Sequence, residues 1–393
     1  MKITKKSFCF FILMTLAQTA FCGSTAEKAH QPMEPNNIQV LIEKNASEAL
    51  LEVRGPYYVY NPYDGARVSS GLMGKRFLLR SINEGLKWGE AFPGIHQIVI
   101  TPRSPSTSIL VNGIQYNGSI IIYKIEKSVQ IINELPIEDY IKSILTDKFP
   151  YPHENEVMAA IAIAARTTAY YQITKNKTSF WHIDAKEENY QGSALVSTDS
   201  AVSTAVDATR NLILVNSGNY NKPFPAHWTE HSAGKTAPFH AIFRKDLQAP
   251  KNGVVASHAE LDREESRWSY SIAKEKLAEA LNLKNITSIE LFVDQDSGKT
   301  YAFRIKNGAL HYDYDFLSIQ KALGEKYILS NDLKITMEDD EIIFSGFGKG
   351  LGVGLCLFSS SAMAQNGEIA IKILTKFFPN TYLINLSAIS TVK

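Results

Sequence analysis

Short apolar runs separated by Gly, Asn and Pro occupy the chain from residue 38 to residue 133. Typical runs are IQVLIEK (38–44), SILVNG (108–113) and SIIIYKI (119–125). Runs of this length, bounded by turn-forming residues, are typical of strands. We therefore predict a β-rich N-terminal part over residues 38–130, preceded by a polar, proline-bearing linker over residues 27–37.

The pattern becomes helical over residues 154–172, where alanine stands at positions 159, 160, 162, 164, 165 and 169. Such small residues favour a helix and let it pack closely against its neighbours. The residues just before it, 139–153, indicate an extended approach and a turn. Further helices are predicted over 197–212 (capped by Ser197 or Thr198), 274–283, 315–324 and 368–378. With strands on either side of a turn at 296–299, they predict a mixed part over residues 131–393. The fold class is therefore α+β, β-rich with a core of small-residue helix.

The first 26 residues carry a targeting pattern. Three lysines are followed by an apolar run, 8–16, and then by small residues, as in signal peptides. The run is shorter than the ~20 apolar residues of a membrane-spanning helix. We therefore predict a signal peptide over residues 1–26 and export to the periplasm or cell envelope. An uncleaved membrane anchor and a lipid anchor on Cys22 are the alternatives.

Charge and cysteine content exclude several classes of protein. Lys and Arg number 41 against 40 Asp and Glu, which excludes a strongly basic nucleic-acid binder. Cys9 and Cys22 lie in the predicted signal peptide, so Cys356 alone would remain and no disulfide framework is expected. No Cys-x-x-Cys pair occurs, so a thiolate zinc site is excluded. We expect no cofactor.

Two glycine-containing stretches are similar to nucleotide-binding loops but do not match them. AGKT (233–236) lacks the glycine that a phosphate loop needs five positions before Gly234. In GFGKGLGVGL (346–355) glycine stands at every second residue, so the spacing Gly-x-Gly-x-x-Gly is not satisfied. Alternating glycines leave a bare face, which admits either a ligand or another stretch of backbone.

The stretch HWTEH (227–231) matches the His-x-x-Glu-His order of a class of zinc metalloproteases. In that chemistry two histidines share one helix face and the glutamate activates a zinc-bound water. Prolines at 223 and 225, and Gly234 and Pro238 on the other side, leave no room for such a helix. The metalloprotease is therefore a remote alternative.

Several separated stretches together resemble the SpoIID/LytB family of peptidoglycan-remodelling proteins, in both order and spacing. They are IINELPIEDYIKSIL (131–145), EVMAAIAIAARTTAYY (156–171), ENYQG (188–192), AVDATRNLILV (205–215), AHWTEHSAGKT (226–236) and the glycine-rich end at 345–381. The likeness covers residues 38–386 and implies a SpoIID-like core within residues 131–393.

The resemblance implies a lytic transglycosylase that acts on peptidoglycan glycan strands without stem peptides. Cleavage needs a general acid that protonates the leaving oxygen, and in this family a glutamate within Ser-Glu-Met-Pro supplies it. The matching stretch here is DKFP (147–150), so Lys148 takes the position of the glutamate and Asp147 precedes it. Other polar positions of the family are also changed here, to Ile161, Leu351, Cys356 and Leu357.

The retained residues are candidates for substrate binding. The resemblance implies this role for Arg166, Tyr190, Ser232, Gly234, Thr236, Gly350 and Gly352. Two structural alternatives stay open: an ion pair of Arg166 with Glu138 or Asp139, and core packing of Tyr190. Some family members bind zinc near the segment that matches 181–192, where only His182 remains here, so no metal is expected.

Two functional hypotheses follow. The first is an exported lytic transglycosylase that uses a relocated carboxylate such as Asp147. The second is a non-catalytic module that binds peptidoglycan glycan strands, or that recruits and stimulates a cell-wall amidase or the septal machinery, as LytB-type members do. Because Lys148 cannot replace a carboxylic acid, the sequence slightly favours binding over cleavage.

Overall fold

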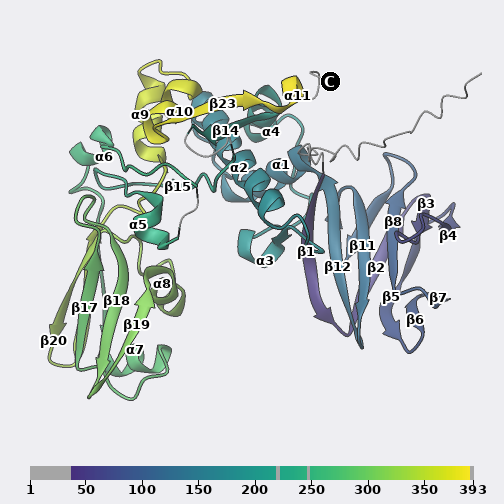
Figure 1. Cartoon of the computed structure of the whole chain (residues 1–393), viewed down its shortest axis with the longest axis horizontal. Coiled ribbons are helices and arrows are strands. Elements are labelled where there is room, and N and C mark those ends of the chain that lie inside the picture. The colour runs from purple at the N-terminus through teal and green to yellow at the C-terminus, as the bar shows by residue number, and fades with distance from the viewer. Residues whose placement is uncertain (1–36, 218–221, 246–247, 390–393) are drawn as a thin grey trace, which may run out of the picture. The chain divides into compact units, whose positions relative to one another are not determined.

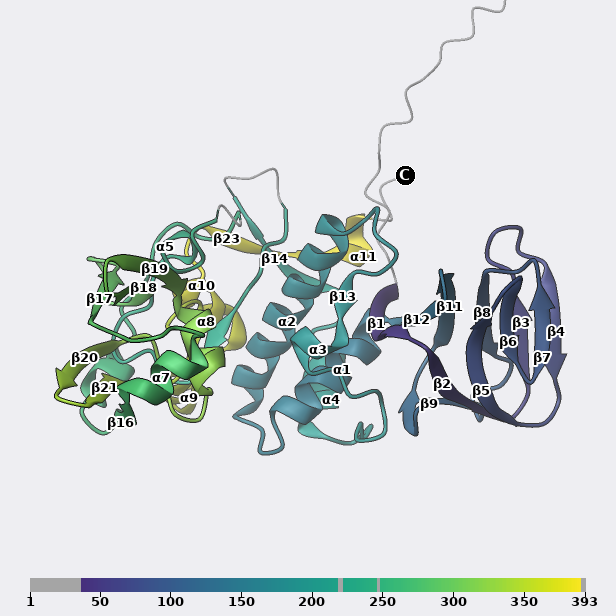
Figure 2. The same ribbon diagram turned by 90° about the horizontal axis from the view of Figure 1, so that it is seen from below.

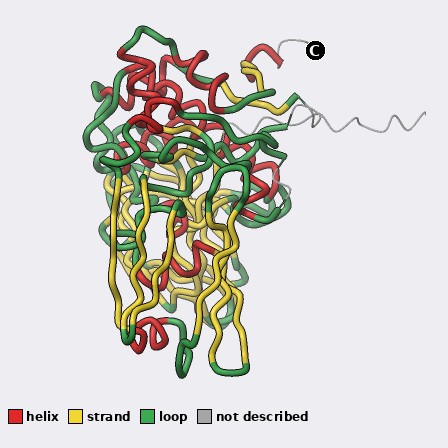
Figure 3. The backbone as a smooth tube through the Cα atoms, turned by 90° about the vertical axis from the view of Figure 1, so that its left-hand side faces the viewer, coloured by secondary structure: helices red, strands yellow, loops and turns green. Residues whose placement is uncertain are grey.

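The computed structural model describes residues 37–217, 222–245 and 248–389 (Figure 1). Strand residues outnumber helical residues (Figure 3), which confirms the β-rich α+β fold class. The predicted signal peptide lies outside the described residues, as does the predicted linker except for Asn37. In the part of the chain that the structure describes, no helix is long and apolar enough to cross a membrane.

The N-terminal part forms two sheets. The first has the strand order β13-β1-β12-β11-β8-β3-β4, with β1 (Asn37–Ala46), β3 (Tyr57–Tyr60), β4 (Arg67–Gly71), β8 (Gln97–Pro102), β11 (Ser119–Ile125), β12 (Ser128–Pro136) and β13 (Ile183–Asp184). The second has the order β10-β9-β2-β5-β6-β7, with β2 (Glu48–Arg54), β5 (Lys75–Ile82), β6 (Gly85–Trp88), β7 (Glu90–Pro93), β9 (Ser108–Val111) and β10 (Ile114–Tyr116). Neighbouring strands are antiparallel, except that β13 pairs with β1 in parallel.

Both faces of the first sheet are covered by other side chains, which explains why its strands are so apolar. Successive side chains of a strand point to opposite faces of its sheet. Ile120 and Ile122 of β11 therefore join the main core, whereas Ile121 joins a smaller cluster with Leu41 and Ile132 on the other face. Both faces of this sheet are covered, so β11 carries three isoleucines in a row.

Helix α2 (Asn155–Lys175) lies at the centre of the helical part and confirms the predicted alanine-rich helix. It is buried around most of its circumference, as expected for a helix that is apolar on all sides. Its small side chains allow close neighbours (Figure 2), which are α1 (Ile137–Lys148), α4 (Ala201–Ala208), α9 (Leu357–Gln365), α10 (Ala370–Phe377) and β14 (Leu212–Asn216). Strand β14 pairs with β23 (Thr381–Asn385).

Two local predictions were wrong. The extended approach predicted from residue 139 is helix α1, which follows β12 directly at Pro136. Its buried residues Ile137, Tyr140, Ile141 and Leu145 have helical spacing, so the signal was present in the sequence. Helix α4 is capped by Ser200, whose hydroxyl accepts a hydrogen bond from the amide of Ser203, and not by Ser197 or Thr198.

A separate hydrophobic core lies within residues 268–344. It is built from two three-stranded sheets, ordered β16-β21-β20 and β17-β18-β19, and from helices α7 and α8. Their bounds are β16 (Arg267–Ala273), α7 (Lys274–Ala280), β17 (Ser288–Val293), β18 (Thr300–Asn307), β19 (Leu310–Asp315), α8 (Phe316–Leu323), β20 (Leu333–Glu338) and β21 (Glu341–Phe347). The main core includes residues from Ile38 to Leu386 and so extends on both sides of residue 130.

Short elements complete the described chain. They are α3 (Ala185–Glu188), β15 (Trp228–Thr229), α5 (Phe239–Phe243), α6 (Ser257–Leu261), β22 (Leu355–Cys356) and α11 (Leu386–Ile389). Strand β15 pairs in parallel with β22, which joins the HWTEH stretch to the end of the glycine run. Two of the stretches that carry the family resemblance therefore meet at this pair of strands.

Candidate functional site

A pocket of about 110 Å³ lies at the C-terminal end of α1. Residues of α1, α2, β13, α3 and the β15 segment line it, and we call it the α1 pocket. Its polar and aromatic lining residues are Tyr140, Lys148, Thr168, Glu188, His227 and Trp228. A second hollow of about 580 Å³ shares Lys148 and also takes in His153, Glu230, His231, Arg267 and Lys349. The two hollows adjoin at Lys148 and together form the candidate functional site.

Lys148 is the last residue of α1, and its side chain lies against an aromatic ring. The ammonium nitrogen is 4.9 Å from the ring centroid of Trp228, within the range of a cation–π contact. A cation in the last turn also interacts favourably with the helix dipole. The position that matches the family's glutamate therefore holds a well-placed positive charge beside an indole ring.

Asp147 points elsewhere. Its Oδ2 accepts a hydrogen bond of 2.6 Å from the Asn189 side chain, and it does not line either hollow. Adjacent residues of a helix are about 100° apart around the axis, so the end of α1 directs only one of the pair into the α1 pocket. The structure places Lys148 there, and a catalytic role of Asp147 stays a prediction.

Glu188 lines the α1 pocket and was not a candidate from the sequence. It ends α3, a short helix capped by Asp184, whose carboxylate accepts from the amide of Lys186 at 3.0 Å. The residue keeps solvent access, but the protein around its carboxyl raises its pKa, with the Lys148 ammonium acting in the opposite direction. Its only sequence signal is its place at the start of the ENYQG stretch.

The histidines of the HWTEH stretch have separate surroundings. His227 stacks on Phe243, with ring centroids 4.9 Å apart, and burial together with the Lys148 charge lowers its pKa to about 4. His231 has its Nδ1 bonded to the amide of Ala233 and its Nε2 3.3 Å from a carboxylate oxygen of Asp262. Burial lowers the pKa of His231, and Asp262 opposes this shift.

The metalloprotease alternative is wrong, because this stretch contains a short strand and no helix. Glu230, the would-be catalytic glutamate, is exposed and pairs with Lys349 at 2.7 Å. Within residues 37–217, 222–245 and 248–389, no group of three or more His, Cys, Asp or Glu side chains could hold a metal ion.

Arg166 is fully buried and lines neither hollow. Its Nε and Nη2 donate to the Glu138 carboxylate at 3.0 and 2.7 Å. Nη2 also donates to the carbonyl oxygen of Val206, and Nη1 to that of Leu212, both at 3.1 Å. All these acceptors belong to the protein, so the structure contains the ion pair with Glu138 that the sequence left open, and substrate binding by Arg166 stays a prediction. Arg166 ties α2 to α1 and to the α4–β14 connection.

The side chain of Tyr190 also lies in the protein interior. Its side chain is 5% exposed, and its hydroxyl donates to Oδ1 of Asn133 at 2.6 Å. The ring packs between those of Tyr140 and Tyr116, with centroid distances of 5.6 and 5.9 Å. The structure therefore shows the core packing that the sequence left open as the alternative to stacking on a sugar.

The five remaining predicted binding residues support backbone packing. Ser232 and Thr236 are buried; the Ser232 carbonyl accepts from Lys299 at 2.7 Å, and the Thr236 hydroxyl accepts from the amide of Val254 at 2.9 Å. Gly234, Gly350 and Gly352 have positive φ of +112°, +104° and +61°. A Cβ on Gly350 would lie 2.4 Å from Oγ1 of Thr229. None of the five lines either hollow, and their ligand contacts stay a prediction.

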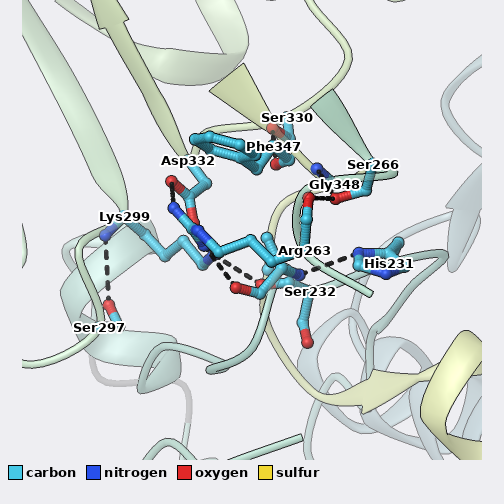
Figure 4. A network of polar contacts seen from close by, with 12 residues as sticks. His231, Ser232, Arg263, Ser266, Ser297, Lys299, Ser330, Asp332, Phe347 and Gly348 are labelled. Carbon is cyan, nitrogen blue, oxygen red and sulfur yellow. Dashed lines mark hydrogen bonds and ion pairs between the residues drawn. The ribbon is translucent and has the colours of Figure 1, made fainter. Parts of the chain in front are cut away.

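An ionic cluster of the buried Lys299 with the half-buried Arg263 and Asp332 holds this region together (Figure 4). Lys299 donates to Asp332 at 2.7 Å, and Arg263 forms two hydrogen bonds with the same carboxylate, at 2.8 and 2.9 Å. The two cations lower the pKa of Asp332 against the opposing effect of burial. Because Lys299 also binds the Ser232 carbonyl, the cluster connects the second core to the segment that follows HWTEH.

Comparison with known proteins identifies similar chains. The SpoIID family, described as Stage II sporulation protein, matches residues 125–216, which contain Lys148, Arg166 and Glu188. An uncharacterised protein of Chlamydia pneumoniae is 33% identical over 194 residues, 49% of this chain and 70% of that protein.

Two further relatives extend the comparison. An uncharacterised protein of Chlamydia muridarum is 38% identical over 181 residues, 46% of this chain and 63% of its own length, slightly less than two thirds. The stage II sporulation protein D of Bacillus subtilis is 20% identical over 292 residues, 69% of this chain and 80% of that protein. This last alignment is long enough to reach beyond the region that the family match covers.

Proposed function

The chain is a divergent member of the SpoIID family, and we propose that it is an exported protein that binds the glycan strands of peptidoglycan at the α1 pocket. The observation that carries this proposal is the juxtaposition of Lys148 and Trp228 at the end of α1, at the position that matches the family's glutamate. Export rests on the sequence pattern of residues 1–26.

The lining of the site suits a sugar polymer that carries carboxylates. An indole offers an apolar face against which a sugar ring can pack, and Lys148 offers a positive charge for the lactyl carboxylate of muramic acid. Glu188 and Thr168 supply polar groups that could fix the orientation of hydroxyl and amide groups. The adjoining second hollow provides room for further sugars of the strand.

Binding of stem-peptide-free glycan strands by the purified protein tests the proposal. We expect Trp228→Ala to weaken binding about tenfold or more, since an aromatic anchor in a pocket commonly contributes more than 1 kcal/mol. Tyr63→Ala is the matched control, because Tyr63 is an exposed aromatic residue that lines neither hollow.

A thermal unfolding curve for each variant separates lost binding from lost folding. Wild-type protein that does not retain the strands, or a folded Trp228→Ala variant that binds as tightly as the Tyr63→Ala control, would contradict the proposal. Recruitment of a cell-wall amidase or of septal proteins stays a prediction.

A further inference from the structure

We propose that Glu188, which lines the α1 pocket from α3, is the general acid of a glycan-cleaving site. This inference rests on the proposed glycan binding and adds a reaction to it. Among the described residues that line the α1 pocket, Glu188 carries the one carboxyl group. It lies in the same pocket as Lys148 and Trp228, so a sugar held by them would lie next to this carboxyl group.

The chain on both sides of Glu188 is fixed in place. Before it, Asp184 caps α3 and belongs to β13, which pairs with β1. After it, Asn189 adopts a left-handed conformation (φ +53°) and donates to Asp147. The next residue, Tyr190, is buried and bonded to Asn133. A short segment held at both ends positions its side chains well, as a catalytic group requires.

The electrostatic surroundings favour an acid that retains its proton. Burial raises the pKa of Glu188, whereas Lys148 opposes the shift. The other titratable groups around it are Glu187 on the same helix, and Tyr140 and His227, which also line the α1 pocket. His227 is neutral at pH 7 because its pKa is lowered to about 4, so it adds no second positive charge. A carboxyl with a raised pKa and solvent access suits general acid catalysis.

The proposed step is balanced without water or a cofactor. The Glu188 carboxyl donates its proton to the oxygen that joins N-acetylmuramic acid to N-acetylglucosamine, and the bond from C1 to that oxygen breaks. The 6-hydroxyl oxygen of the muramic acid then bonds to C1, and its proton passes to the Glu188 carboxylate. The products are a 1,6-anhydro-muramic end and a free 4-hydroxyl end, with the acid restored.

The test uses the full chain and stem-peptide-free glycan strands, with products read by mass spectrometry and binding read by pull-down. Glu188→Gln keeps the size of the side chain and removes the acid. Glu187→Gln is the matched control, because Glu187 lies on the same helix but does not line the α1 pocket. We expect 1,6-anhydro ends from wild type and Glu187→Gln, and a loss of about 100-fold or more in Glu188→Gln, the typical contribution of a general acid.

Each outcome separates this inference from the proposed function. Strands that bind to wild type without any anhydro product would overturn the role of Glu188 and leave glycan binding in place. Products that persist in a Glu188→Gln variant that still binds would do the same. Products that vanish in Asp147→Asn but not in Glu188→Gln would assign the acid to Asp147. Absence of binding by wild type would overturn the proposed function itself.

A pH profile provides a readout that a structural role would not change. The reaction needs protonated Glu188, so its rate should fall as the pH rises through the pKa of this group. Lys148→Gln removes a charge that lowers this pKa, so the fall should move to higher pH. An unchanged profile in a Lys148→Gln variant that still cleaves would contradict the proposal.

Discussion

The buried pair Arg166–Glu138 allows a decisive test of whether Arg166 supports the fold or binds a ligand. Arg166 is fully buried and Glu138 is 4% exposed, and their nearest atoms are 2.7 Å apart. Removing one member of a buried pair commonly costs about 3–5 kcal/mol, because the other charge stays buried without its partner. We therefore expect Arg166→Met and Glu138→Leu each to lower the free energy of unfolding by about that amount.

The double variant Arg166→Met/Glu138→Leu should be less destabilised than the sum of its single variants, because no uncompensated charge remains. Urea unfolding of the wild type, both single variants and the double variant at pH 7 measures the coupling free energy, which we expect to be about 2 kcal/mol or more. The control is Asp207→Asn, which removes the half-exposed partner of Lys142 between α1 and α4. Its effect should stay within about 1 kcal/mol.

Glycan binding by the same variants completes the test. Below its unfolding transition, each folded variant should retain the strands as wild type does, because Arg166 lines neither hollow. If Arg166→Met lost less than about 1 kcal/mol and also lost glycan binding, the structural assignment would be refuted and Arg166 would be a ligand-binding residue.

Two further predictions concern stability. The pKa of His227 is lowered to about 4, so below its ordinary pKa of about 6.5 the unfolded chain takes up a proton that the folded chain does not. The free energy of unfolding should therefore fall by about 2 kcal/mol between pH 7 and pH 5. Denaturant curves at several pH values should show that His227→Phe removes this pH dependence. Gly354→Ala should cost more than about 2 kcal/mol, because its Cβ would lie 2.0 Å from the carbonyl oxygen of His227, whereas Gly367→Ala meets no atom within 4 Å. Thermal melts in which both glycine variants lose equal stability would contradict this reasoning, as would an unchanged pH slope in His227→Phe.

Local signals in the sequence were sufficient for much of the fold. The alanine-rich stretch predicted α2, because a helix with small side chains on all sides must lie in a core. Short apolar runs bounded by turn-forming residues predicted the strands of the two N-terminal sheets. The failure at α1 arose because β12 passes into the helix without a loop, so the usual turn residues between two elements are missing.

The site could not be predicted in the same way, since its residues come from distant parts of the chain. Lys148 and Glu188 are 40 positions apart, so only the packing of α1 and α3 shows that they line one pocket. From the sequence, the bare face of the alternating glycines at 346–354 could contact either a ligand or another stretch of backbone. In the structure, a Cβ on Gly354 would clash with the carbonyl oxygen of His227, so this glycine allows the close approach of another stretch of backbone.

The retained residues that the resemblance predicts to bind substrate are a different set from the residues that line the α1 pocket. Arg166, Tyr190 and the glycines of the run are buried and satisfied by protein groups, so their presence preserves the scaffold whether or not the chain cleaves glycan. Lys148, at the position of the family's glutamate, does line the α1 pocket, and there the acid is missing. Family membership therefore supports the substrate class more strongly than the reaction. Whether cleavage survives depends on Glu188, a residue that reaches the α1 pocket from α3 and not from the end of α1.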